Sequence, residues 1–247
     1  MEQERVAADA QARPALAGRW WILFALTLAY GLNVVDRYLL GILLPQIKAE
    51  LSLPDWSLGV LSGFAFAVFY ATLGLPIARL ADRHNRKMII SACLALFSAA
   101  TAICGFATNF LTLFLARIGV GIGEAGTGPA SYSMISDLFE KARRSTAMAI
   151  YAVGGNVGLL IGFAAGGYMA ANYGWRTAFF VIGAPGILVA LLVLFTVRDP
   201  ARGAADGLAP NADATTSIED AFRFLWSQPA FRWIVIGSTL VQFLSTG

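Results

Sequence analysis

Apolar residues fill six long stretches of this chain, each close to the ~20 residues that a helix needs to cross the hydrocarbon core of a bilayer. The stretches are residues 20–44, 57–80, 88–107, 110–134, 146–171 and 177–197. A seventh apolar stretch begins near residue 230 and continues to the last residue, 247. This pattern predicts an all-α membrane protein with six spans and the start of a seventh. We therefore expect the chain to be part of a longer protein.

The polar residues between these stretches divide the chain into four segments. We expect a cytoplasmic tail at 1–18, a six-helix transmembrane bundle at 19–197, a cytoplasmic linker at 198–229 and the start of a seventh span at 230–247. The first span lacks a small-residue cleavage site and is too long for a signal peptide, so we expect it to remain as an anchor. Within the linker, residues 218–226 place apolar side chains at helical spacing, which is typical of an amphipathic helix on a membrane surface.

Composition and charge support a membrane protein, because 57% of the residues are hydrophobic, 13% are charged and the mean hydropathy is +0.66. Lys and Arg concentrate in cytoplasmic loops. With a cytoplasmic N-terminus, only Lys48 and Arg176 fall in outer loops, and only Arg37 and Arg117 fall within spans. The formal net charge of +3 thus reflects topology, and a nucleic-acid partner is disfavoured. We expect a multi-pass protein of the cell membrane, surrounded by lipid.

The fourth stretch carries two charges where lipid would surround a helix. Arg117, Gly121, Glu124 and Gly128 recur at i, i+4, i+7 and i+11, which places them on one helical face. A charge at bilayer depth costs about 2.5–3.5 kcal/mol, so both charges need a partner or a polar cavity. A structural ion pair is one interpretation, but ionisable residues in spans more often serve function.

The first stretch carries a second polar cluster, formed by Asn33, Asp36, Arg37 and Tyr38. Adjacent residues are separated by about 100° around a helix, so one lipid-facing side cannot hide both Asp36 and Arg37. Asp36 and Arg117 each lie roughly 10–12 Å from the outer ends of their spans. If spans 1 and 4 are neighbours, the two clusters form a polar ladder. Spans 1 and 4 also begin the two halves of an inverted three-helix repeat, as in secondary transporters.

The loop at 80–87, LADRHNRK, places one acid among several bases. Asp82 contributes little to topology and so needs another explanation. We expect its carboxylate either to cap the start of span 3 or to pair with Arg143 or Arg144 in the next inner loop. His84, the one histidine in the chain, is interpreted as solvated.

Span 5 repeats glycine at every fourth residue, which is typical of a face for close helix packing: Gly154, Gly158, Gly162 and Gly166. Cys93 and Cys104 lie about 16 Å apart on one predicted helix, too far to form a disulfide. We expect no metal site and no cofactor.

The 80–87 loop resembles the signature of the major facilitator superfamily, G-x-x-x-D-R-x-G-R-R/K, with Ala78 and Asn85 in place of the glycines. The D-R-x-N-R-K form is similar to the Spinster branch. Further likenesses to this branch are residues 33–37 followed by Pro45, R-I-G-V-G-I-G-E at 117–124, S-D-L-F at 136–139 and G-W-R at 174–176. The resemblance implies the N-terminal six-helix half of a twelve-helix transporter, built from two inverted three-helix repeats and completed by a second six-helix half.

The resemblance also implies a function, namely alternating-access transport of lysophospholipid or sphingoid-type amphiphiles, driven by a proton gradient without a cofactor. Asp36 and Glu124 resemble the family's protonatable carboxylates. The residues implied for substrate binding are Arg37, Arg117, Glu124, Asn33 and Tyr38. Those implied for a cytoplasmic gate are Asp82, Arg83, Arg86, Lys87, Arg143 and Arg144. The superfamily's antiporter motif is not supported, because no proline occurs between Tyr151 and Tyr173.

Three other functions are open to test. A carrier of small organic anions or drugs would use the same arginines, since a guanidinium binds a carboxylate as well as a phosphate. A receptor on the same fold would bind without transport. A membrane enzyme is disfavoured, because the chain has no H-E-x-x-H and no G-x-S-x-G motif.

Overall fold

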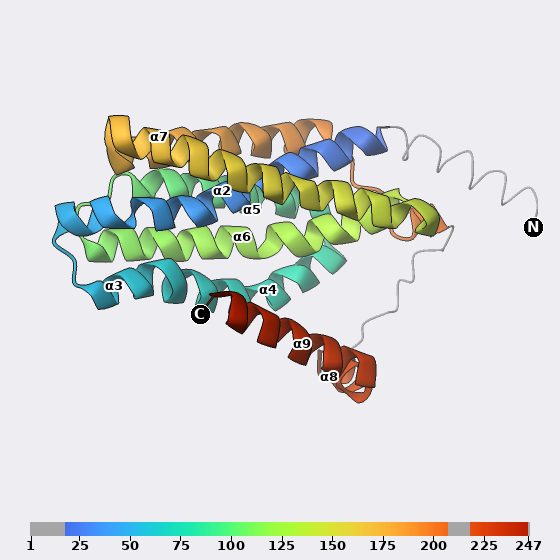
Figure 1. Cartoon of the computed structure of the whole chain (residues 1–247). Coiled ribbons are helices and arrows are strands. Elements are labelled where there is room, and N and C mark those ends of the chain that lie inside the picture. The colour runs from blue at the N-terminus through green and yellow to red at the C-terminus, as the bar shows by residue number, and fades with distance from the viewer. Residues whose placement is uncertain (1–17, 207–217, 247) are drawn as a thin grey trace, which may run out of the picture. The chain divides into compact units, whose positions relative to one another are not determined.

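The computed structural model describes residues 18–206 and 218–246, and all regular elements in those ranges are helical. The chain divides into two units, Met1–Ala209 and Pro210–Gly247, which are described separately. The helices of the first unit are α2 (Arg19–Leu51), α3 (Asp55–Gly59), α4 (Ala65–Arg83), α5 (Arg86–Cys104), α6 (Phe110–Leu138) and α7 (Lys141–Thr196) (Figure 1). A π-helical turn, Val60–Phe64, joins α3 to α4, and a short 3-10 turn, Ala204–Asp206, follows α7.

Five helices in the described ranges are long and apolar enough to cross a membrane. The last of them, α7, is two helices joined at Gly174, whose φ of 80° is one that residues with a side chain rarely adopt. The two arms of α7 run in opposite directions along the bundle in Figure 1. With these arms counted separately, the six predicted spans are all present, and the prediction of an all-α membrane bundle is confirmed.

The turn at Gly174 is fixed by the two residues that follow it. Trp175 Nε1 donates a hydrogen bond to Glu50 at the end of α2 (2.6 Å), and Arg176 forms an ion pair with the same carboxylate. Arg176 also donates to the carbonyl of Ala107, which follows α5 (2.9 Å). This end of the bundle therefore holds three chain segments together through one glutamate and one arginine.

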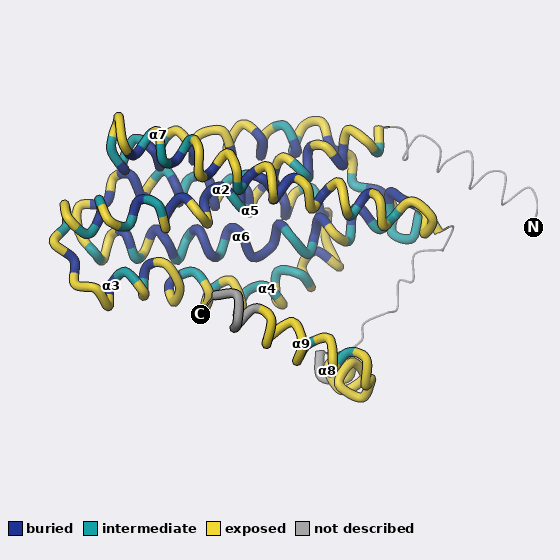
Figure 2. Tube along the Cα trace, viewed as in Figure 1, coloured by how far each residue is buried: buried dark blue, intermediate teal, exposed yellow. Residues whose placement is uncertain are grey.

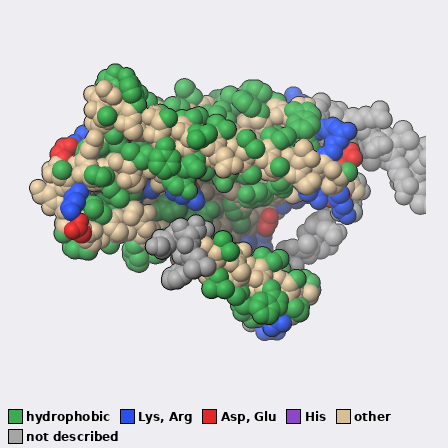
Figure 3. Space-filling view, viewed as in Figure 1, with side chains coloured by type: hydrophobic (Ala, Val, Ile, Leu, Met, Phe, Trp, Pro, Cys, Tyr) green, Lys and Arg blue, Asp and Glu red, His purple; other side chains and the backbone are tan. Residues whose placement is uncertain are grey.

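Helix α6 lies inside the bundle and packs against α4, α5 and α2, while α7 packs against α2 and α5. More than half of the most apolar window of α2, α5 and α6 is buried, compared with 11% for the α3–α4 span (Figure 2). The surface of the first unit is hydrophobic along its length, and charged side chains gather toward its two ends (Figure 3). This distribution is typical of a bundle surrounded by lipid.

The first arm of α7 approaches α2 as closely as glycine allows. A Cβ atom added at Gly158 would lie 2.3 Å from the carbonyl oxygen of Gly31, and one at Gly154 would lie 2.5 Å from that of Thr27. Gly162 and Gly166, one and two turns further along, also face α2, where added Cβ atoms would lie 3.3 Å from the Val35 backbone and 2.8 Å from Leu39 Cδ1. The predicted packing face of span 5 therefore lies against span 1.

The second unit contains α8 (Ile218–Ser227) and α9 (Pro229–Thr246), which contact each other. Helix α8 covers the predicted amphipathic stretch, and the rings of Phe222 and Trp226 stack on it with centroids 5.6 Å apart. Helix α9 covers the start of the predicted seventh span. The predicted tail, except for Gly18, and the linker residues 207–217 lie outside the described residues.

We expect Gly158→Ala to destabilise the bundle, because the added methyl group would force α2 and α7 apart. Overpacking of this kind costs about 1–3 kcal/mol. Gly167→Ala is the matched control, since a Cβ atom at this neighbouring helical glycine meets nothing within 4 Å. Thermal unfolding of each purified variant gives its melting temperature. Equal melting temperatures for the two variants would contradict the close packing of α2 and α7.

Candidate functional site

Two ion pairs connect α2 to α6 inside the bundle. In the first, Arg117 Nη1 donates to Asp36 Oδ2 at 2.7 Å, and these side chains are only 2% and 0% exposed. The other oxygen of Asp36 accepts a hydrogen bond from the Thr101 hydroxyl of α5 at 2.8 Å. This buried pair therefore ties three helices together.

In the second pair, Arg37 Nη2 donates to Glu124 Oε2 at 2.6 Å. This pair is asymmetric, because the Arg37 side chain is 47% exposed and that of Glu124 is 1% exposed. The guanidinium lies over the rings of Phe66 and Tyr70 of α4, 4.9 and 5.5 Å from their centroids. Glu124 Oε1 is buried without a hydrogen-bond partner among the described residues. A buried polar atom of this kind calls for water or a proton.

The four charges predicted to form a ladder thus lie together, paired in the order Asp36 with Arg117 and Arg37 with Glu124. The adjacent acid and base on α2 reach two different turns of α6. Formal charge cancels within each pair, which lowers the cost of burial. If Arg37 moved away, Glu124 would be a buried, unpaired carboxylate, and protonation would relieve that cost.

The other two predicted substrate residues flank these pairs. Asn33 is buried, and its Oδ1 has no partner among the described groups. Tyr38 is 44% exposed and contacts the ring of Phe163 on α7, with centroids 5.8 Å apart. Arg37 and Tyr38 line a polar pocket of about 190 Å³ between α2 and α7.

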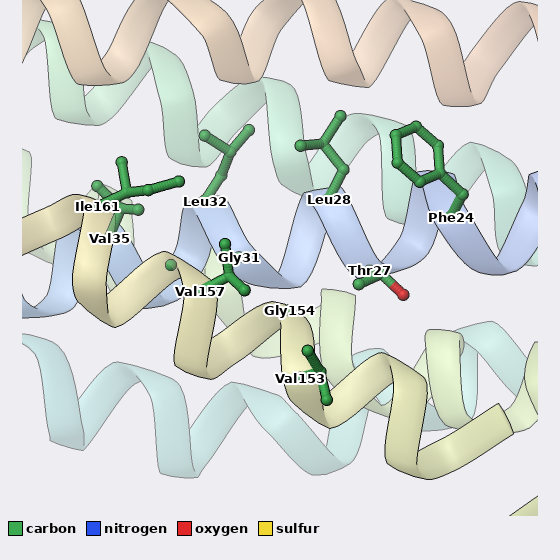
Figure 4. Close-up of a pocket in the computed structure, with 11 residues that line it drawn as sticks. Phe24, Thr27, Leu28, Gly31, Leu32, Val35, Val153, Gly154, Val157 and Ile161 are labelled. Carbon is green, nitrogen blue, oxygen red and sulfur yellow. The ribbon is translucent and has the colours of Figure 1, made fainter. Parts of the chain in front are cut away.

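A second pocket, of about 230 Å³, lies along the same two helices and is apolar. Phe24, Leu28 and Leu32 of α2 line it together with Val153 and Val157 of α7 (Figure 4). No charged side chain lines this pocket, so it offers nothing that would bind a polar head group.

A polar network surrounds Arg86, which is 1% exposed although it lies at the start of α5. Its backbone N–H and its Nε donate to the carboxylate of Asp199 at 2.7 and 2.8 Å. Its guanidinium also forms an ion pair with Asp137 of α6 and donates to Ser133 Oγ (3.1 Å) and the Pro200 carbonyl (2.5 Å). Arg86 therefore joins α5 and α6 to the chain after α7.

The stretch at 198–206 is tied to the bundle at further points. Arg202 donates to the carbonyl of Ala81 at 2.9 Å, and the N–H of Gly203 donates to Asp137 at 2.9 Å. Arg144 of α7 forms an ion pair with Asp206 at 2.9 Å. One end of the bundle is thus crossed by a segment that contacts α4, α6 and α7.

Both roles expected for Asp82 are wrong. The cap of α5 is Asn85, whose side chain accepts from the N–H of Met88, and the carboxylate paired with Arg144 is Asp206. The reason is that α4 continues to Arg83, which places Asp82 on the exposed last turn of that helix. Three other expected gate residues also form no ion pair with another described residue: Arg83, Lys87 and Arg143.

Sequence reasoning missed several contacts of the site, made by Thr101, Ser133, Asp137 and Asp199. For the two aspartates a signal existed, because acids at span ends contribute little to topology. Phe66 and Tyr70 of span 2 contact Arg37, but aromatic residues are common in membrane helices and gave no sequence signal for this contact. Cys93 and Cys104 are free thiols, as predicted. Among the described residues no group of three or more His, Cys, Asp or Glu side chains could hold a metal ion.

Membrane-length helices that enclose paired charges beside a polar pocket are typical of a multi-pass membrane protein with a polar site inside the membrane. The family model described as Major Facilitator Superfamily matches residues 26–247. The chain therefore belongs to the major facilitator superfamily, and its relatives show that it is Spinster-like and corresponds to the N-terminal half of the fold.

The relatives include an MFS-type efflux pump of Mycolicibacterium smegmatis, 33% identical over 90% of this chain and 51% of the pump. Protein spinster homolog 1 of Xenopus laevis is 30% identical over 91% of this chain and 42% of that protein. A similar solved structure is a bacterial homolog to the human lysosomal transporter Spinster, inward-facing and unoccupied. It has a TM-score of 0.79 and 36% identity over 92% of this chain and 53% of that one. The chain spans about half the length of these relatives.

We expect Arg117→Leu to destabilise the protein by about 3–5 kcal/mol, because it leaves the Asp36 carboxyl group buried without its partner. The double variant Asp36→Asn/Arg117→Leu should recover much of this loss, since it removes both charges. Lys48→Met is the control for an exposed ion pair, that of Lys48 with Asp55, and should cost less than about 1 kcal/mol. The measurement is the free energy of unfolding of each variant. A similar loss for Arg117→Leu and Lys48→Met would refute the assignment of Asp36 and Arg117 as a buried ion pair.

We expect Arg86→Lys to release the 198–206 segment, because lysine cannot make the several directed hydrogen bonds of the guanidinium. Trypsin cleavage after Arg198 and Arg202 should accelerate by about tenfold or more, as follows from losing one hydrogen bond to a charged group. Arg83→Lys, the same change at an exposed position, is the control. Unchanged cleavage in Arg86→Lys would show that Arg86 does not hold the segment.

Proposed function

We propose that the complete protein is a proton-coupled secondary transporter that moves lysophospholipid or sphingoid-type amphiphiles by alternating access. The observation that carries this proposal is the asymmetric pair of Arg37 and Glu124. Its arginine lines a polar pocket, and its glutamate is buried. The other six-helix half of the fold would supply the second wall of the transport path.

The coupling follows from a competition for Arg37. An anionic head group that binds this guanidinium draws it away from Glu124, and the unpaired carboxylate then takes up a proton. Loss of that proton restores the pair and displaces the head group. Proton binding and substrate binding therefore favour each other, which is the requirement for thermodynamic coupling. Asp36 is the second carboxylate assigned to this exchange, and Arg117 is its partner in the paired state.

The network around Arg86 is assigned to a cytoplasmic gate. The distribution of basic residues supports a cytoplasmic N-terminus in the cell membrane, which places this end of the bundle inside. Arg86 and Arg144 hold the 198–206 segment through Asp199 and Asp206. The exposed residues Asp82, Arg83 and Arg143 and the half-buried Lys87 are available to the second half of the transporter. Helix α8 is assigned to the inner membrane surface.

A carrier of small organic anions or drugs is the second candidate. The exposed guanidinium of Arg37 would bind a carboxylate as well as a phosphate. The 33% identity to a bacterial efflux pump also favours this candidate. A receptor on the same fold would bind the same ligands without flux.

The proposal predicts that uptake of labelled lysophospholipid into liposomes holding the complete protein responds to an imposed pH gradient. Glu124→Gln and Asp36→Asn should abolish this response, because neither side chain can exchange a proton. Asp55→Asn is the control, since it removes an exposed carboxylate outside the two central pairs and outside the Arg86 network.

Gradient-driven uptake that survives Glu124→Gln and Asp36→Asn would refute the assigned coupling. Binding without gradient-sensitive flux would favour facilitated diffusion or a receptor. Uptake of small organic anions but not of lysophospholipid would support the second candidate.

A further inference from the structure

The polar pocket between α2 and α7 contains side chains that neither the sequence motifs nor the ion pairs assign. Tyr30, Arg37 and Tyr38 line it from α2, and Asn156 lines it from the first arm of α7. Its volume of about 190 Å³ is below the roughly 300–1,000 Å³ of a pocket that encloses a whole ligand. The size therefore suits one polar group of a larger molecule.

The wall of this pocket is held in place by packing. The ring of Tyr30 lies against α7 at Gly155, where an added Cβ atom would come within 2.6 Å of Tyr30 Cε1. One turn earlier on α7, the buried ring of Tyr151 stacks on Tyr30, with centroids 4.7 Å apart and planes at 20°. Tyr151 in turn packs edge-on against Tyr132 of α6. A wall fixed before the ligand arrives binds with less loss of conformational freedom.

The chemistry of the lining selects for negative charge. Arg37 brings a guanidinium, Asn156 an amide NH₂, and the two tyrosines bring hydroxyl donors. No carboxylate lines the pocket, and the acid nearest to it in the ion-pair network, Glu124, is engaged on Arg37 from α6. Charge-assisted hydrogen bonds from such donors are the usual means of binding phosphate and carboxylate groups.

We propose that this pocket is the subsite for the oxyanion of the substrate, a phosphate, sulfate or carboxylate, and that Asn156 is a specificity-determining residue of that subsite. The inference rests on the proposed transport function and adds to it the α7 side of the binding site. Asn156 donates to the oxyanion that Arg37 holds from α2. Gly155 serves the subsite by leaving room for Tyr30.

The test is equilibrium binding of dodecyl phosphate to the complete protein in detergent, without a pH gradient. Asn156→Asp should raise the Kd by about tenfold or more, because an acceptor that repels the oxyanion replaces a donor. Gly155→Ala should also raise the Kd, because its methyl group displaces Tyr30 into the pocket. Asn172→Asp is the matched control, the same change at an exposed position roughly 24 Å further along α7, and should leave the Kd within about twofold.

A cationic probe with the same alkyl chain, dodecyltrimethylammonium, distinguishes loss of oxyanion recognition from misfolding of the variant. It should bind native protein weakly, and Asn156→Asp should strengthen its binding. Unchanged dodecyl phosphate binding in Asn156→Asp, or equal weakening in Asn172→Asp, would overturn the subsite. Weakening of both probes by Asn156→Asp would also overturn it.

Two further comparisons identify the source of the oxyanion and distinguish failure of the subsite from failure of the proposed transport function. Competition by inorganic phosphate and dodecyl phosphate alike would support a subsite for free anions, and competition by dodecyl phosphate alone would support one for an amphiphile head group. Asn156-dependent binding without gradient-driven uptake would retain the subsite and reject proton coupling. Gradient-driven uptake that is indifferent to Asn156 and Gly155 would retain the transporter and reject the subsite.

Discussion

Asp36 and Arg117 form the buried contact on which the interior of the bundle depends. A carboxylate and a guanidinium at bilayer depth are tolerated because each neutralises the other, and the Thr101 hydroxyl satisfies the remaining carboxylate oxygen. The pair also fixes how α2 lies relative to α6. That register brings the next residue of α2, Arg37, to Glu124, two turns along α6. The buried pair of Asp36 and Arg117 therefore positions the partly exposed pair of Arg37 and Glu124.

Helix α6 connects the centre of the bundle to its end. It carries Arg117 and Glu124, the partners of both α2 charges, and further along it carries Ser133 and Asp137, which bind Arg86. A change in the tilt of α6 would alter these contacts together, since they lie on one continuous helix. The close contacts of the α7 glycines with α2 restrain the position of α2. This arrangement gives the proposed proton exchange a physical route to the proposed gate.

The fold could be predicted from the sequence because a span needs a long apolar stretch, and all six stretches are long enough to reach across the hydrocarbon core of a membrane. The charged residues of the site, such as Arg117 and Glu124, could be predicted because a charge is costly inside the membrane and so calls for a special environment. Their partners depend on which helices pack together, so Thr101 gave no local signal. The roles expected for Asp82 failed because the end of α4 lies one residue beyond it. Asn156 is one polar residue in a glycine-rich span, and only the pocket shows what it faces.

The central claim is that Glu124 exchanges a proton when substrate takes Arg37 from it. Infrared difference spectroscopy tests this directly, by comparing the complete protein with and without bound substrate at one pH. We expect substrate binding to increase the absorption of a protonated carboxyl group. This change should be absent in Glu124→Gln and should persist in Asp55→Asn, which removes an exposed carboxylate outside the site. An identical carboxyl difference spectrum in the native protein and in Glu124→Gln would contradict the account.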